Sequence, residues 1–146
     1  MESLSGRRPP LSFVLDCSAT IAFLLPDESP PVAQNVLQSI LDHGAWTPTH
    51  WRLEVANALA SAIRRRRITR NFRDEALTDL ALFPIRTDPQ THLICWTASL
   101  ALANRLGQTI YDAAYLKLAL RSNLPLATLD KDLQNSAVKM GASLIG

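Results

Sequence analysis

Four carboxylates lie where the sequence otherwise places apolar side chains. Asp16 and Asp130 each follow a short apolar run, and Glu54 and Asp112 lie within largely apolar segments of helical character. An ionised carboxylate is rarely buried unless it pairs with a cation or binds a metal. Four carboxylates in one pocket repel one another until a divalent cation neutralises them. Ligands of this kind suit Mg²⁺ or Mn²⁺ rather than Zn²⁺, so the pattern predicts a divalent metal site.

Three of these acids also have a local structural explanation. Asp16 is in a position to cap the helix that follows it, and Asp130 is in a position to cap the last helix. Asp112 comes three residues after Thr109, a spacing typical of a capping box. Asp132, two residues after Asp130, is an alternative for the fourth acid of the pocket. Each of the three therefore indicates a metal site only in combination with the others.

Glu54 is harder to explain as a residue of a solvated helix face. No lysine lies one helical turn from it, and Asn57 and Ser61 continue the same stripe. This stripe of polar side chains could line a ligand-binding site, so we interpret Glu54 as functional. His50, one turn before Glu54, is close enough in sequence to support it, but we favour its interpretation as a solvent-facing side chain.

Short apolar runs alternate with segments of helical periodicity along the chain. Strands are predicted at residues 12–16, 45–48, 84–87, 126–128 and 143–145. Helices are predicted at residues 19–25, 30–41, 49–67, 69–83, 89–107, 109–123 and 133–140. This alternation predicts an α/β fold with a mostly parallel sheet and helices on both faces. Asp16 and Asp130 then fall at the carboxyl ends of strands, where such sheets have their functional crevice.

The composition fits a single domain without membrane spans. The chain has 146 residues, a hydrophobic fraction of 47% and a net charge of +2, so whole-chain charge does not identify nucleic acid as a partner. Residues 1–11 are expected to be a flexible leader, followed by one domain at residues 12–146. The two cysteines match no metal-ligand spacing, and no secretory signal is recognisable. A cytoplasmic protein without a membrane partner is therefore expected.

The arginines form one dense cationic cluster. Its members are Arg64, Arg65, Arg66 and Arg67. One interpretation is an edge beside the acidic pocket that contacts RNA phosphates. The other is a solvated helix C-terminus, where arginines interact favourably with the helix dipole. The sequence leaves both interpretations open.

The tryptophans and the first cysteine have mainly structural interpretations. Trp51 is a candidate for stacking on a base, whereas Trp46 and Trp96 are expected in the core. If strand alternation continues past Asp16, Cys17 points away from the acids and is buried and unreactive.

Five segments of the chain carry a resemblance to a known family. They are residues 14–19, 25–28, 50–59, 111–116 and 126–130. The most specific are Leu-Glu-Val-Ala-Asn-Ala-Leu at 53–59 and Tyr-Asp-Ala-Ala-Tyr-Leu at 111–116. In order and spacing these segments resemble PIN-domain ribonucleases, and most closely the VapC-type toxins of bacterial toxin–antitoxin pairs.

The resemblance implies a three-layer α/β/α sandwich with a mostly parallel sheet and a site for Mg²⁺ or Mn²⁺. It implies a catalytic, metal-binding set made of Asp16, Glu54, Asp112 and Asp130. Ser18 and Thr128 match positions where the family often has a small hydroxyl or amide near the metal. Asn57 matches a polar companion of the acid on the helix.

The resemblance also implies an activity and partners. The activity is hydrolysis of RNA phosphodiester bonds by the toxin component of a type II toxin–antitoxin system. The partners are a second copy of the chain in a homodimer and a VapB-type antitoxin whose C-terminal segment covers the acidic pocket. The alternative from another class is a catalytically silent PIN-like module that uses its acids to hold an arginine-bearing partner.

Overall fold

The computed structural model describes residues 12–25, 27 and 30–145. The predicted leader at residues 1–11 lies outside these described residues. The strands are Val14–Leu15 (β1), Ala45–Thr47 (β2), Ile85–Thr87 (β3) and Leu126–Ala127 (β4). The helices are Cys17–Leu24 (α2), Pro31–His43 (α3), Trp51–Arg64 (α4), Arg70–Leu82 (α5), Thr91–Ile94 (α6), Ala98–Leu106 (α7), Ile110–Ser122 (α8) and Lys131–Lys139 (α9). Within the described ranges, no helix combines the length and the hydropathy that a membrane span requires.

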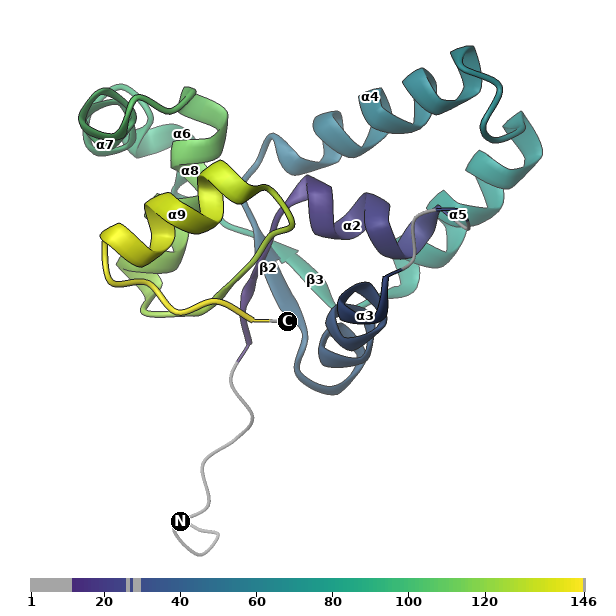
Figure 1. The fold of residues 1–146 in the computed structure, drawn as a ribbon, viewed down its shortest axis with the longest axis horizontal. Coiled ribbons are helices and arrows are strands. Elements are labelled where there is room, and N and C mark those ends of the chain that lie inside the picture. Colours follow the sequence, from purple (N-terminus) through teal and green to yellow (C-terminus); the bar gives the residue numbers. More distant parts are fainter. Residues whose placement is uncertain (1–11, 26, 28–29, 146) are drawn as a thin grey trace, which may run out of the picture.

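The strands form one parallel sheet in the order β3-β2-β1-β4. Val14 of β1 pairs with Trp46 of β2 and with Leu126 of β4. Phe13, Val14 and Leu15 are fully buried, as expected for a central strand that is covered on both faces. In Figure 1, α2 to α5 lie on one side of the strands and α6 to α9 on the other. The predicted α/β/α architecture with a parallel sheet is confirmed.

Polar side chains and a proline begin several of the helices. Backbone N–H groups are capped by the side chains of Asp16 (α2), Thr69 (α5), Thr109 (α8) and Asp130 (α9). Pro31 occupies the first position of α3, where an α-helix makes no use of the N–H that proline lacks. These start signals are local, which explains why most helix boundaries were predictable to within a few residues.

The predicted helix at residues 89–107 is wrong, because the chain there forms two helices, α6 and α7. Thr97, between them, has φ of −120° and ψ of −90°, which lies outside the helical region. Asp88 ties the start of α6 to the end of α8, whereas α7 packs against α8 directly. The break allows the chain to make both attachments. Trp96, which was expected in the core, lies at this break and is 88% exposed.

Several other predicted boundaries differ from the structure, including the end of the long helix α4, which is Arg64 rather than residue 67. Residues 143–145 do not form a full strand, because Leu144 makes a single parallel bridge to Leu126. The last helix begins at Lys131 rather than at residue 133, because Asp130 caps its N-terminus through the N–H groups of the next turn. Capping thus lengthens this helix beyond its apolar repeat.

The tryptophans of β2 and α4 both belong to the core. Trp51 is 4% exposed, and its indole N–H donates to the hydroxyl of Thr20 over 3.0 Å. Its predicted role in stacking on a base is therefore wrong. Trp46 packs against the core as expected, with the guanidinium of Arg86 5.8 Å from the centre of its ring.

A buried ion pair joins the segment after β3 to the C-terminal half of α8. Asp88 is 4% exposed, and its carboxylate accepts hydrogen bonds from the Thr91 hydroxyl over 2.8 Å and from the Arg121 guanidinium over 2.5 Å. A buried carboxylate is tolerated when a cation and further donors surround it. The pair therefore fixes α6 against α8.

Arg121→Ala is expected to lower the free energy of unfolding by about 3 kcal/mol, because Asp88 would stay buried without its cation. Urea denaturation followed by circular dichroism measures this change. The control is Arg73→Ala, which removes an exposed pair with Asp74 and is expected to lower stability by less than about 1 kcal/mol. Equal losses in the two variants would contradict the buried-pair interpretation.

Candidate functional site

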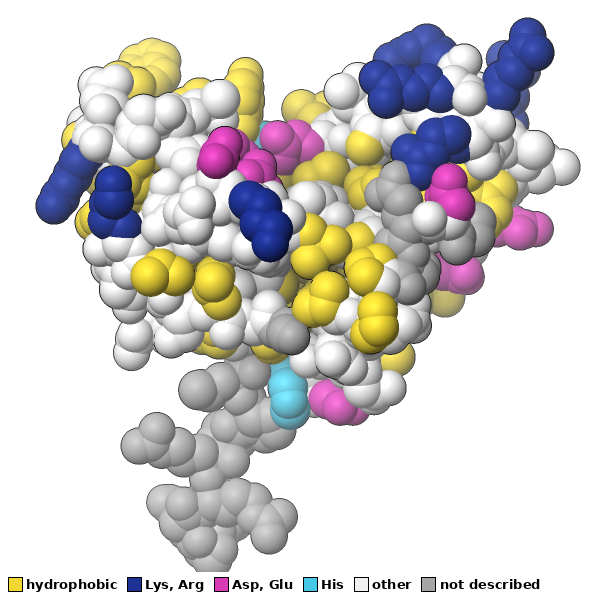
Figure 2. Space-filling model, viewed as in Figure 1, with side chains coloured by type: hydrophobic (Ala, Val, Ile, Leu, Met, Phe, Trp, Pro, Cys, Tyr) yellow, Lys and Arg dark blue, Asp and Glu magenta, His cyan; other side chains and the backbone are white. Residues whose placement is uncertain are grey.

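All four predicted acids lie at the N-terminal ends of helices. Asp16 caps α2 and Asp130 caps α9, while Glu54 and Asp112 lie in the first turns of α4 and α8. Because α2 follows β1 and α9 follows β4, both helices start at the carboxyl ends of neighbouring parallel strands. Figure 2 shows acidic side chains gathered in a hollow between the lobe of α7 to α9 and the arm formed by α4 and α5.

Asp16 is held at both of its carboxylate oxygens. Its Oδ1 accepts hydrogen bonds from the Ser18 hydroxyl over 2.8 Å and from the backbone N–H of Ala19 over 2.9 Å. Its Oδ2 accepts a hydrogen bond from the Thr128 hydroxyl. Ser18 in turn accepts the N–H of Leu129 over 2.9 Å, which links the start of α2 to the segment after β4. The two predicted supporting residues, Ser18 and Thr128, are thus both in direct contact with Asp16.

Burial raises the pKa of Asp16 from 3.8 to about 6, although three hydrogen bonds oppose the rise. The carboxyl is only 5% exposed, and removal from water disfavours its charged form. The nearby charge of Asp112 raises the pKa further. A carboxylate in such a place is more stable when a cation lies beside it.

Asp112 is half-buried and lies within the electrostatic reach of the other acids. Burial raises its pKa first, and the charges of Asp130 and Glu54 raise it further, in that order. Asp132 has a smaller effect on Asp112 and is exposed, whereas Asp130 is half-buried. Asp130 thus acts on Asp112 more strongly than Asp132 does, even though Asp130 also caps α9.

Glu54 accepts a hydrogen bond from a residue on another helix. The hydroxyl of Tyr115 donates to its Oε1 over 2.5 Å. The Nε2 atom of His50 lies 3.8 Å from the same oxygen and 3.1 Å from the carbonyl oxygen of Tyr111. His50 is half-buried, so its interpretation as a solvent-facing side chain is wrong. Burial lowers the pKa of His50, although the charge of Glu54 opposes this effect.

Comparison with known proteins identifies the fold family. Residues 13–139 match the family model described as the PIN domain. The chain belongs to the PIN domain family. PIN domains are generally nucleases. The crystal structure of PAE2754 from Pyrobaculum aerophilum is similar to this PIN domain, with a TM-score of 0.63, 21% sequence identity, and coverage of 87% of this chain and 85% of that chain. At that identity the likeness shows the fold alone. No curated protein matches the chain.

Sequence reasoning missed Tyr115 and misplaced Cys17. Tyr115 lies in an apolar helical segment, and its position is typical of a core residue. A buried tyrosine hydroxyl usually has a hydrogen-bond partner, and this rule could have indicated a polar contact at Tyr115. Cys17 begins α2 and is half-buried rather than lying on the far side of a strand. Burial raises the pKa of its thiol to about 12, and the charges of Glu54 and Asp16 contribute, so Cys17 is a neutral thiol near neutral pH.

The other predicted polar residues make no hydrogen bond to the acids among the described residues. Asn57 is exposed on α4, and its side chain has no hydrogen-bond partner among the described residues. The arginine cluster lies at the opposite end of α4 from Glu54, which at 1.5 Å per residue places Arg64 about 15 Å away. Arg67 forms an ion pair with Asp27 over 3.2 Å. Figure 2 shows basic side chains gathered at the far end of this arm of the PIN domain.

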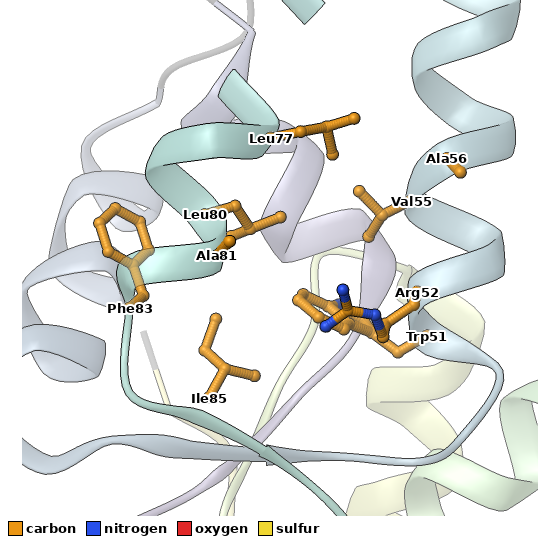
Figure 3. A pocket seen from close by; sticks show the side chains of 9 residues that line it. All are labelled: Trp51, Arg52, Val55, Ala56, Leu77, Leu80, Ala81, Phe83 and Ile85. Carbon is orange, nitrogen blue, oxygen red and sulfur yellow. The ribbon is translucent and has the colours of Figure 1, made fainter. Parts of the chain in front are cut away.

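A cavity of about 270 Å³ lies between α4 and α5, apart from the acids. Figure 3 shows the side chains of the two helices facing each other across it. It is lined by Trp51, Arg52, Val55, Ala56, Leu77, Leu80, Ala81, Phe83 and Ile85. Apart from Arg52 its lining is apolar, so it offers no groups for hydrolysis.

The acids fit a divalent metal by the chemistry of their donors. They supply only carboxylate oxygens, which are the ligands that Mg²⁺ prefers. The charge of Asp112 raises the pKa of Asp16, and the charges of Asp130 and Glu54 raise the pKa of Asp112. Within the described part of the chain, no three His, Cys, Asp or Glu side chains form a ready-made metal cluster. An ion such as Mg²⁺ that keeps several of its waters does not require such a closed cluster. The residues of this PIN domain therefore fit a partly hydrated ion.

Proposed function

We propose that the chain is a Mg²⁺- or Mn²⁺-dependent endoribonuclease that acts in the cytoplasm as the toxin of a type II toxin–antitoxin pair. The observation that carries the proposal is the electrostatic coupling of the four acids at the helix N-termini of a PIN domain. Membership of a family of nucleases supports hydrolysis, and the resemblance of the motifs to VapC-type toxins supports RNA as the substrate.

The metal would be held by the carboxylates at the carboxyl edge of the sheet. The proposed ligands are Asp16, Glu54, Asp112 and Asp130. The bound ion would supply Lewis-acid chemistry to the phosphodiester and to water, and hydrolysis would leave a 5′-phosphate. Ser18 and Thr128 keep Asp16 in one orientation through hydrogen bonds to its two oxygens. Pre-set ligands of this kind reduce the entropy that is lost when the ion binds.

The arginine cluster would contact the RNA backbone on one side of the acids. Arg64, Arg65 and Arg66 are exposed, and none forms an ion pair with a described residue. An acidic pocket repels the phosphates of its substrate, so cationic side chains on its flank are needed to hold the chain. Arg67 contributes less to this surface, because it also pairs with Asp27.

The proposed regulatory partner is a VapB-type antitoxin that presents an arginine to the acids. A guanidinium forms strong hydrogen bonds with carboxylates and supplies part of the charge that a metal would supply. A homodimer of the toxin is proposed on the same family resemblance. The competing function is a catalytically silent PIN-like module that binds such a partner without cleaving RNA.

The test is RNA cleavage by the protein purified free of its partner, in Mg²⁺ and in EDTA. Cleavage is expected in Mg²⁺ only, and Asp112→Ala is expected to lower the rate at least about 100-fold, because the site would lose a ligand. Asp79→Ala, which removes an exposed acid of α5, is the control and should cleave like the parent. Cleavage that persists in EDTA would refute the metal assignment. Absence of cleavage of total RNA in Mg²⁺ would favour the silent module.

A further inference from the structure

Glu54 and Asp16 are held in the site by different means. Asp16 has a short side chain, and it is surrounded by two donors from its own helix and by Thr128, the residue that follows β4. Glu54 has a longer side chain that is 32% exposed. Among the described residues, the hydroxyl of Tyr115 is the hydrogen-bond donor that contacts it. The contact joins two helices whose residues lie 61 positions apart in the chain.

Tyr115 is itself firmly placed. The residue is 2% exposed and lies within the hydrophobic core. The ring of His50 packs edge-on against its ring, with the centroids 5.0 Å apart. His50 is anchored in turn, because its Nε2 atom lies 3.1 Å from the carbonyl oxygen of Tyr111. The Tyr115 ring therefore has little freedom to move its hydroxyl away from Glu54.

The protonation of Tyr115 suits a hydrogen-bond donor. An ordinary tyrosine phenol is protonated at neutral pH and is a hydrogen-bond donor. The hydroxyl thus keeps its proton near neutral pH and donates it to Oε1. This leaves Oε2 of Glu54 without a hydrogen-bond donor among the described residues.

We propose that Tyr115 is a positioning residue that holds Glu54 by Oε1 and keeps Oε2 available to the divalent ion. The assignment rests on the proposed function as a metal-dependent nuclease. A glutamate has three rotatable side-chain bonds, and binding an ion would freeze them at a cost in entropy. The hydrogen bond from Tyr115 restricts these bonds before the ion binds, as residues that hydrogen-bond to metal ligands do in other sites.

The experiment is a titration of the full chain with Mn²⁺, without RNA, followed by electron paramagnetic resonance of the free ion. Tyr115→Phe is expected to raise the dissociation constant for Mn²⁺ about tenfold, because it removes the hydroxyl and keeps the ring. The matched control is Tyr111→Phe on the same helix, where the residue is 57% exposed and its hydroxyl makes no hydrogen bond to a described residue. Its dissociation constant should stay within the error of the parent value.

A double-mutant cycle with Glu54→Ala separates positioning from a general structural effect. If Tyr115 acts through Glu54, Tyr115→Phe has no further effect on Mn²⁺ affinity once Glu54 is absent. An equal loss in both backgrounds would overturn the proposal, as would unchanged affinity in Tyr115→Phe alone. Near-ultraviolet circular dichroism confirms that each variant is folded. A parent protein that binds no Mn²⁺ at millimolar concentration would refute the proposed function itself, and the positioning role with it.

Discussion

Asp16→Asn is expected to abolish RNA cleavage and, in EDTA, to raise the free energy of unfolding at pH 7. The loss of a proposed metal ligand should lower the cleavage rate by at least about 1000-fold. The gain in stability follows from burial, which raises the pKa of Asp16 from 3.8 to about 6. At pH 7 the folded protein must keep this carboxyl charged in a buried place, and the neutral amide avoids that penalty. We expect a gain of about 2 kcal/mol, less than the full shift implies, because the amide nitrogen cannot accept a hydrogen bond and the amide oxygen accepts weaker ones.

The stability difference between the parent and Asp16→Asn is expected to depend on pH. Because the folded pKa of Asp16 lies above the unfolded value, the folded state binds more protons between pH 4 and pH 6. The stability that the protonated group contributes is complete below about pH 4 and is lost as the pH rises through about 6. Urea denaturation in EDTA should therefore show parent and Asp16→Asn converging at low pH and separating towards pH 7. A parent more stable than the variant at pH 7 would contradict the raised pKa.

Neutralising three arginines is expected to weaken RNA binding about 100-fold at 0.1 M salt. The variant carries Arg64→Ala, Arg65→Ala and Arg66→Ala together. Each phosphate contact to single-stranded RNA contributes a salt-dependence slope of about 0.7, so three contacts contribute about 2. Binding is measured by fluorescence anisotropy against salt concentration, with Asp16→Asn in both proteins to prevent cleavage.

The salt dependence distinguishes phosphate contacts from an indirect effect of the substitutions. The slope of the logarithm of affinity against the logarithm of salt concentration should fall by about 2 in the triple variant. The control neutralises Arg105 and Lys139, which are exposed on α7 and α9, and it should leave the slope unchanged. An unchanged slope in the triple variant would show that the arginines form only a solvated helix end.

The positions of the acids were largely predictable because their signals are local. Asp16 and Asp130 follow apolar strands. Because these strands are parallel neighbours, they end at the same edge of the sheet. Their capping roles and their membership of the acidic cluster proved compatible, since a carboxylate can accept backbone N–H groups and still face a pocket. The sequence presented these two roles as competing explanations.

The contacts that support the site were not predictable in the same way. Tyr115 and Glu54 lie on different helices, and no spacing in the sequence predicts the hydrogen bond between them. Periodicity also failed between β3 and α8, where Leu93, Trp96 and Leu100 follow a helical repeat but are 69%, 88% and 44% exposed. A repeat shows that apolar residues share a face, but tertiary packing decides whether that face is covered.

The placement of all four acids at helix N-termini sets the charge that the site must balance. Each helix end is equivalent to about half a positive charge, so α2, α4, α8 and α9 together supply about two. Four ionised carboxylates then retain about two negative charges, which one divalent ion neutralises. A single arginine from a protein partner supplies only half of that charge. An inhibitor that matches the pocket in charge would therefore have to bring a second cationic group.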